Sequence, residues 1–240
     1  MKLKCINCGS QRGNAYFLED SEGNQLLLDA GTKMKEIEKA FKFDFTKIIG
    51  ACITHHHKDH SACADELSKY GIPIYAPYIN TKPIKFKGGS NWRIQSFELT
   101  DIDGKFTHTD ADGTECKCYG FYIYHPEMGT MLYITDTELV KYRFKNINHI
   151  LIGCNYQKKY IERNTAKRKH VVTGHMELET VKEFIKCNYT DDLKNVILCH
   201  LSDEGANPSE MISEIINVAQ TSNVDVASKN KEWNMNLLPF

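Results

Sequence analysis

The sequence predicts a layered α/β fold, in which strands and helices alternate along the chain. Two observations lead to this prediction. Short apolar strands with turn residues between them fill the first 29 residues, and from residue 33 onward segments of helical spacing alternate with strand-like apolar runs. In addition, several of these apolar runs end directly in a His or an Asp. Open α/β sheets bind ligands at this place, beyond the carboxyl ends of their strands.

Composition limits the domain organisation and the partners. With 240 residues, 41% of them hydrophobic, and no linker-like tract, we expect a single domain over residues 1–240. The 30 basic and 31 acidic side chains nearly cancel, so any attraction to nucleic acid must be local. We find no signal peptide or membrane span. Nine cysteines, an odd number, suit reduced thiols, and we therefore expect a cytoplasmic protein with no membrane partner.

The first third of the chain is predicted to form a β meander followed by alternating helices and strands. The turn residues at 21–24 mark a hairpin, and Ile37, Ala40 and Phe41 have helical spacing. Gly71 would end the second helix. The expected strands are 2–6, 15–18, 25–29, 47–53 and 72–76, and the expected helices are 33–43 and 61–70.

The rest of the chain continues the alternation around a polar insertion at 100–117. The expected strands are 92–99, 119–124, 131–135, 149–154, 195–199 and 224–227, and the expected helices are 171–187 and 208–219. Three apolar runs end at His55, Asp136 and His200. If their strands share a sheet and run the same way, these residues lie side by side.

The run from Thr54 to His60 is the hardest to explain as ordinary structure, because it packs four imidazoles and a carboxylate behind a buried strand. In extended backbone, residues two apart point the same way, so His55 and His57 can converge while His56 points elsewhere. Asp59 and His60 could serve a second metal. An exposed polar loop that binds metal adventitiously is the alternative, but the internal position of the run argues against it.

The T-H-x-H-x-D-H run, with a later isolated His, an Asp after a strand and a final His after another, resembles the metallo-β-lactamase superfamily along nearly the whole chain. This resemblance implies an αββα sandwich of two mixed β-sheets flanked by helices. It also implies a dinuclear centre with Asp136 as the bridge. The implied ligands are His55, His57 and His108 at one metal and Asp59, His60 and His200 at the other.

The implied cofactors are two divalent metal ions. Zinc suits such imidazole-rich sites, with manganese or iron as alternatives. His57 stands where the flavodiiron branch of the superfamily generally has Glu, which favours hydrolytic chemistry. Genuine β-lactamases typically lack the counterpart of His60 and have Cys where Asp136 stands, so we do not expect antibiotic hydrolysis. For His108, which lies in the insertion, Asp101 and Asp110 are rival ligands.

Within the superfamily, the sequence is most similar to the YycJ-like (WalJ) group, which is related to ribonuclease Z and its phosphodiesterase relatives. The similarity rests on Tyr-Ile-Thr-Asp-Thr at 133–137, Gly-His-Met at 174–176 and Cys-His-Leu-Ser at 199–202. Where that group usually has Glu-Ser-Asn, only Asn155 carries over. The resemblance therefore implies a phosphodiesterase or nuclease.

The expected chemistry is hydrolysis by a hydroxide held between two metals about 3.5 to 4 Å apart, which also stabilise the charge on a phosphodiester. Two catalytic candidates assist. Asp59 could orient the hydroxide or accept its proton, and His175 could protonate the leaving group. A His that merely caps or packs at a helix start is the alternative for His175.

A basic run at 158–170, with six Lys or Arg against one Glu, provides the hint about the substrate. Such a run can hold phosphates while aromatic rings stack on bases, although many charge runs are only solvated surface. We expect nucleic acid or a nucleotide phosphodiester as the partner. The candidate substrate-binding residues are Asn155, Tyr160, Lys167 and Arg168.

Two alternatives remain for the function. One is a hydrolase of a small substrate, either a cyclic nucleotide or a thioester in the manner of glyoxalase II. The other is a metal-stabilised nucleic-acid-binding module without turnover. Separately, Cys5, Cys8, Cys116 and Cys118 could hold a structural zinc, although the second pair has unusual spacing.

Overall fold

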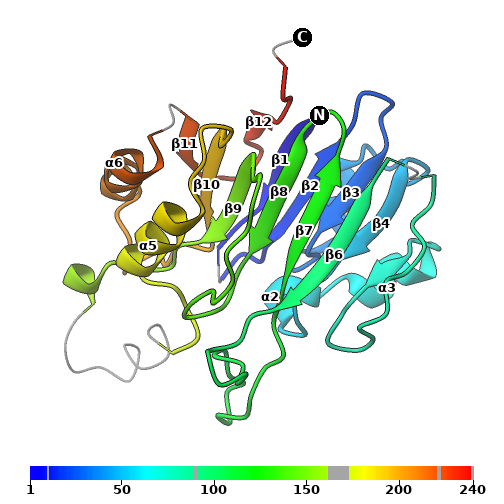
Figure 1. The fold of residues 1–240 in the computed structure, drawn as a ribbon. Helices are drawn as coiled ribbons and strands as arrows, with labels where there is room; N and C mark the ends of the chain where they lie inside the picture. Colours follow the sequence, from blue (N-terminus) through cyan, green and yellow to red (C-terminus); the bar gives the residue numbers. More distant parts are fainter. Residues whose placement is uncertain (10, 89–90, 162–172, 221–222, 239–240) are drawn as a thin grey trace.

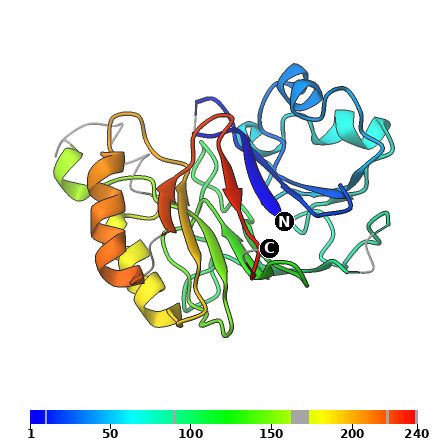
Figure 2. The ribbon, with the colours of Figure 1, turned by 90° about the horizontal axis from the view of Figure 1, so that it is seen from above.

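The fold is that of a computed structural model, which describes residues 1–9, 11–88, 91–161, 173–220 and 223–238 (Figure 1). Two sheets of six strands each pack face to face, and helices cover their outer faces. Figure 2 shows α5 and α6 on one side of the molecule and the helices of the first third on the other. The predicted αββα sandwich is thereby confirmed.

The first sheet has the strand order β12-β1-β2-β3-β4-β5, and only its β3, β4 and β5 run parallel to one another. Its outer face carries two short helices, α1 and α3, and α2 precedes α3. The strands are β1 (Lys2–Asn7), β2 (Ala15–Glu19), β3 (Gln25–Leu28), β4 (Ile48–Cys52), β5 (Ile74–Tyr75) and β12 (Glu232–Asn234), and the helices are α1 (Met34–Ala40), α2 (Lys58–Ser61) and α3 (Ala64–Lys69).

The second sheet has the order β11-β10-β9-β8-β7-β6, with β8, β9, β10 and β11 parallel. A single 3₁₀ turn, η1, follows β9 along the chain. The strands are β6 (Arg93–Glu98), β7 (Tyr119–His125), β8 (Gly129–Ile134), β9 (His149–Gly153), β10 (Asn195–Cys199) and β11 (Asn223–Val226), and the helical elements are η1 (Lys158–Tyr160), α5 (Leu178–Asn188) and α6 (Pro208–Ala219).

Three layers of apolar side chains hold the sandwich together. Leu26 and Leu28 of β3 face the layer between the sheets, whereas Leu27 faces the layer beneath α1 and α3. This alternation follows from the two-residue period of a strand, and all three leucines are fully buried because both faces are covered. Val181 of α5 and Met211 of α6 belong to the third layer, over the second sheet.

The structure differs from the sequence prediction at the helix expected over 61–70. The helix α2 ends at Ser61 and a separate helix, α3, begins at Ala64. The chain breaks here because the backbone groups of residues 59 and 63 form hydrogen bonds with other segments. The N–H of Cys63 donates to the carbonyl of Ala30, and the carbonyl of Asp59 accepts from Asn14. The bond between these two groups that a continuous helix requires is therefore replaced by bonds to the first sheet.

Two other differences concern the expected helix over 171–187 and the last strand. Of that segment, 171–172 lies outside the described residues, and the helix begins at Leu178, where the Glu177 side chain accepts from the N–H of Glu179. His175 therefore lies in a turn before the helix. The strand β12, which pairs with β1, was not predicted.

The three strands that precede His55, Asp136 and His200 do not share one sheet. β4 belongs to the first sheet, whereas β8 and β10 belong to the second, with β9 between them. The condition that we placed on the prediction was therefore wrong. The residues nevertheless meet, because the carboxyl ends of β4, β8 and β10 lie at the same end of the sandwich.

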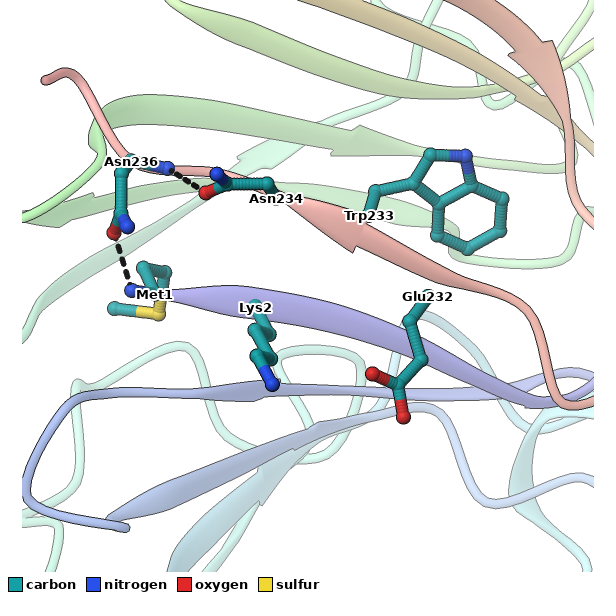
Figure 3. Close-up of a pocket in the computed structure, with 6 residues that line it drawn as sticks. All are labelled: Met1, Lys2, Glu232, Trp233, Asn234 and Asn236. Atoms are coloured by element: carbon teal, nitrogen blue, oxygen red, sulfur yellow. Dashed lines mark hydrogen bonds between the residues drawn. The ribbon is translucent and has the colours of Figure 1, made fainter. Parts of the chain in front are cut away.

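The opposite end of the first sheet holds a surface pocket (Figure 3). Lys2 pairs with Glu19 and Glu19 with Gln25, which are the strand ends remote from the His run. The pocket is lined by Met1, Lys2, Glu232, Trp233, Asn234 and Asn236. Within the described part of the chain, no helix is long and apolar enough to span a membrane.

Candidate metal centre

Asp136 lies at the centre of a ring of imidazoles. It follows β8 with one residue between, and only 5% of its surface is exposed. Among the described residues, no Lys or Arg side chain forms an ion pair with it, whereas His nitrogens approach it from several elements. The distances to its carboxylate oxygens are 3.0 Å from His60, 3.3 Å from His55, 3.3 Å from His200, and 3.9 Å from both His108 and His175.

The structure brings His55, His57 and His108 together. Nδ1 of His57 lies 3.0 Å from Nε2 of His108, and the His55 ring contacts both other rings at centroid distances of 4.8 and 5.3 Å. Their ligand atoms lie within 4.8 Å of one another. We call these three residues the loop-braced group, after the supports described below.

Asp59, His60 and His200 form the second group, which we call the sheet-braced group. Oδ2 of Asp59 lies 3.4 Å from Nε2 of His60 and 3.3 Å from Nε2 of His200. Together with Asp136 their ligand atoms also lie within 4.8 Å of one another. Asp136 thus stands between the two groups, as the bridging position requires.

Backbone geometry at the strand ends helps to place these side chains. Asp29 follows β3, Asp136 follows β8 and His200 follows β10, with φ angles of +57°, +43° and +55°. Residues other than glycine rarely adopt this left-handed conformation, and where they do, the strain often belongs to a functional site. In each case the chain turns sharply as it leaves the sheet.

Asp29 supports the sheet-braced group from within the protein. Its fully buried carboxylate accepts hydrogen bonds from the backbone N–H and hydroxyl of Thr54 and from the hydroxyl of Tyr133, at 2.6 Å for the tyrosine. Its Oδ2 lies 2.7 Å from Nδ1 of His60. This bond leaves Nε2 of His60 to face Asp136, the arrangement of a carboxylate that orients a metal-binding imidazole.

Asn14 and Asn155 complete these supports. The Asn14 amide lies 3.2 Å from Nε2 of His60, and the Asn155 amide donates to the carbonyl of His200 at 2.9 Å. The backbone contributes as well, because the carbonyl of Asp59 accepts from the N–H of Asn14 at 2.7 Å. A Cβ added at Gly31 would lie only 1.7 Å from that carbonyl oxygen, so this approach requires glycine.

The supports of the loop-braced group come from connecting segments. Nε2 of His57 lies 2.8 Å from Oδ1 of Asp110, within the insertion between β6 and β7. Nδ1 of His108 lies 3.0 Å from the carbonyl of Gly174, whose N–H donates to Glu138 at 2.8 Å. Gly174 has a φ of +80° and no room for a Cβ, because His108 is in contact with it.

The protonation states of His55 and Asp136 suit a divalent cation. Burial, together with the neighbouring His60, lowers the pKa of His55 well below its ordinary value, so this imidazole is neutral. Burial opposes ionisation of Asp136, but His200 and His60 outweigh it and hold the pKa of this carboxyl well below its usual range. Neutral imidazole and ionised carboxylate are the forms that bind metal. The pKa of His57 is raised to about 9, mainly by its hydrogen bond with Cys116, and at His60 burial is outweighed by Asp136 and Asp29, which raise the pKa, so these two rings would release a proton when a metal ion binds.

A buried nitrogen without a hydrogen-bond partner provides the test of fit. Nε2 of His55 is fully buried and makes no hydrogen bond, although it lies 3.3 Å from Asp136. A buried polar atom without a partner is costly, and a metal ion would satisfy it. The donor set therefore fits divalent metal binding.

His175 lies at the rim of the cluster. Its ring stacks on that of His200 at 5.5 Å and meets that of His108 edge to face at 5.0 Å. Its side chain keeps 10% of its surface exposed. The rivals for the role of His108 lie elsewhere: Asp110 contacts the outer nitrogen of His57, and Asp101 accepts from the backbone of its own turn.

The candidate substrate residues are more scattered. Lys167 and Arg168 lie outside the described residues. Asn155 is 5% exposed and contacts His200, so it supports a proposed ligand where we expected a substrate contact. Tyr160 is 39% exposed, and its hydroxyl donates to Glu210 of α6.

The two cysteine pairs do not share a site among the described residues. Cys5 lies in the layer between the sheets, whereas Cys116 and Cys118 lie in the layer under α5 and α6, with ligand atoms near His55. Sequence reasoning missed Cys116 as a neighbour of the His run, and it also missed Asp29. The signal for Asp29 was available, since this residue also ends a strand.

Comparisons with known proteins give the same architecture. The model of the metallo-β-lactamase superfamily matches residues 9–140. Similar structures include YhfI, a metallo-β-lactamase fold protein from Bacillus subtilis, with a TM-score of 0.65, 17% identity and coverage of 97% of this chain and 98% of that chain. Unliganded yeast PDE1 has a TM-score of 0.66, 10% identity and coverage of 96% and 98%.

The short form of human tRNase Z (ELAC1) is also similar, with a TM-score of 0.60, 12% identity and coverage of 98% of this chain and 99% of that chain. No curated protein matches the sequence. The YycJ-like branch is not among these findings, so it stays a prediction. Since the family model matches more than half of the residues, the chain belongs to the metallo-β-lactamase superfamily.

Proposed function

We propose that this protein is a dinuclear metal-dependent phosphodiesterase that cleaves DNA or RNA, with zinc as its metal. The observation that carries the proposal is the position of Asp136, whose carboxylate lies within 3.9 Å of imidazole nitrogens from both groups. A single carboxylate shared by two sets of ligands is what a two-metal site requires. Membership in a superfamily of metal-dependent hydrolases supports it.

The protein's own residues would divide the work as follows. When bound, two divalent cations supply Lewis acidity and lower the pKa of water. Asp59, with 26% of its side chain exposed, can orient the attacking water or accept its proton. His175, at the rim of the cluster, can donate a proton to the leaving alkoxide. Both act beside Asp136, which stays ionised.

The substrate class is supported from two directions. The similar structures include one that is by its name a phosphodiesterase and one that is by its name a ribonuclease. The basic run at 158–170 adds a local positive charge to a chain with a net charge of −1. In its described part, Lys159 pairs with Glu210 and lies over the Tyr160 ring.

A small-substrate hydrolase is the second candidate, because the same ligand set serves cyclic nucleotides and thioesters equally well. A binding module without turnover is less consistent with the structure, since structural metal sites are usually closed and mononuclear. Here the cluster keeps an exposed edge at Asp59 and His57, each with 26% of its side chain exposed.

The experiment that decides between these functions tests all the candidate substrates with the same protein preparation. Metal-free protein is loaded with Zn²⁺ or Mn²⁺ and incubated with labelled single- and double-stranded DNA, RNA, a cyclic dinucleotide and a glutathione thioester. We expect cleavage of at least one polynucleotide, and we expect His57→Ala to abolish it. Cleavage of the thioester alone would contradict the proposal, as would fewer than two bound metals without turnover.

The role of the basic run needs its own test. Changing Lys167 and Arg168 to Ala should weaken polynucleotide cleavage more strongly at low salt than at high salt, because each lost phosphate contact makes binding less dependent on salt. Changing Lys39 and Lys186 to Ala is the matched control, since both are exposed lysines on helices away from the cluster. Equal activity in the two double variants would remove this run from the substrate site.

A further inference from the structure

A second group of His, Asp and Cys side chains, all of types that can bind metal, lies beside the proposed centre and outside its seven residues. Nε2 of His56 lies 2.8 Å from Oδ1 of Asp110, and Nδ1 of the same ring lies 3.6 Å from the Cys116 thiol. Ligand atoms of these three residues and of His57 lie within 4.8 Å of one another. In the sequence, His56 reads only as a spacer between two ligands.

The segment that carries Asp110 and Cys116 is held in place by its own backbone. Thr109 and Glu115 form an antiparallel bridge, and the N–H of Cys116 donates to the carbonyl of His108 at 2.9 Å. Residues 108–116 therefore form a small hairpin. This hairpin places Asp110 and Cys116 beside His56.

The contacts within this set resemble those of metal ligands, because several donor atoms converge on one point, which an ordinary surface ion pair does not do. One oxygen of Asp110 faces both His56 and His57 at 2.8 Å, so two imidazoles converge on a single atom. The Cys116 thiol is fully buried, and Cys118 donates to its sulfur at 3.8 Å, which leaves the sulfur of Cys116 as an acceptor. His56 has 48% of its side chain exposed, so an ion could enter.

We propose that His56, Asp110 and Cys116 bind an additional divalent metal ion of the zinc class, next to the dinuclear centre. A thiolate, an imidazole and a carboxylate are ligands that Zn²⁺ takes in proteins, and three protein ligands leave a fourth position open. His57 stands between the sites, with Nδ1 facing His108 and Nε2 facing Asp110. The site does not depend on the reaction of the dinuclear centre.

Cobalt provides a direct test, because the seven residues of the dinuclear centre include no sulfur. The protein is stripped with a chelator and titrated with Co²⁺, and the near-ultraviolet absorption is followed. A thiolate bound to Co²⁺ gives a charge-transfer band there. We expect this band in the unchanged protein, and we expect Cys116→Ser, His56→Ala and Asp110→Asn each to lose it and to bind one Co²⁺ fewer per chain.

The controls separate this site from its neighbours. Cys187→Ser changes an exposed thiol on α5 and should leave the band in place. If His56→Ala keeps the band while Cys116→Ser loses it, Cys116 binds a metal of the dinuclear centre, and the proposal is wrong. The absence of any band in the unchanged protein would also overturn it. The His56 side chain is 48% exposed, so we expect His56→Ala to fold even where Cys116→Ser does not.

Discussion

The two groups that flank Asp136 contain similar ligands but are held in different ways. The sheet-braced group depends on Asp29, Asn14 and Asn155, which lie at the ends of strands or directly beside them. The loop-braced group depends on Asp110 and on the carbonyl of Gly174, both in long connections. Strand ends are fixed by the sandwich, whereas connections vary more readily. The first group therefore has the more rigid support.

The largest effect should follow from removing the residue that the groups share. Asp136→Asn keeps the size of the side chain but removes its charge. We expect a fall in kcat/KM of about a thousandfold and a weaker affinity at both metals. Metal analysis after gel filtration and steady-state kinetics measure the two effects. Loss of only one metal would show that Asp136 does not serve both groups.

The next test addresses the sheet-braced group alone. The carboxylate of Asp29 has two oxygens that accept hydrogen bonds from Thr54, Tyr133 and His60. Asp29→Asn replaces one of these oxygens with an NH₂ group, which can only donate. We expect about a hundredfold loss of affinity in one of two metal-binding steps, because His60 is no longer oriented. Competition with a chromophoric chelator measures both steps. Equal weakening of both would mean that the groups do not respond independently.

A smaller effect is expected at the support of the loop-braced group. A Cβ at Gly174 would lie 2.4 Å from Nδ1 of His108, so Gly174→Ala should displace this imidazole and weaken the other metal-binding step about tenfold. The matched control is Gly113→Ala. Gly113 has a similar φ of +86° but nothing within 4 Å of the added Cβ. If both variants bind metal alike, backbone strain alone explains the result.

The smallest effect concerns a histidine outside both groups. His149 is fully buried, with Asn195 and the carbonyl of Met128 as partners, and burial lowers its pKa from 6.5 to about 4. As the pH falls below about 6.5, His149 becomes protonated in the unfolded chain but stays neutral in the folded protein, so the free energy of unfolding decreases. Between about pH 7 and about pH 5.5 this loss is about 1 kcal/mol.

The variant His149→Gln should remove that part of the pH dependence and leave the remainder, which comes from the other groups whose pKa values differ between the folded and unfolded protein. Urea unfolding at each pH, with metal removed, measures the difference. An unchanged slope would show that His149 titrates normally. The comparison then distinguishes a histidine buried for packing, with both ring nitrogens bonded, from one such as His55, whose Nε2 has no hydrogen-bond partner.

The sequence allowed most of the fold to be predicted, because the strands are apolar and their ends are polar. Strand β10 and helix α6 were predicted at their observed bounds. The break between α2 and α3 could not be predicted, since it depends on the bond from Cys63 to Ala30, more than thirty residues away in the chain. The positions of His108 and Gly174 depend on the same kind of long-range contact.

For the site, the residues that end strands gave the clearest signal, and the resemblance supplied the rest. The proximity of Asp110 and Cys116 to His56 had no such signal, because it results from how the insertion folds back over the His run. Short-range patterns do not determine where a long connection lies. Side chains on such connections are therefore the ones that sequence reasoning misses.

The close approach of Gly31 to the carbonyl of Asp59 has a consequence for how metal is exchanged. Main-chain bonds from Asn14 and Ala30 to residues 59 and 60 fix the turn that carries four of the proposed ligands, without the help of any ligand side chain. Little chain entropy is then lost when an ion arrives. We expect the metal-free turn to keep its amide hydrogen-exchange protection, so that ions enter and leave a preorganised frame while the protein stays folded.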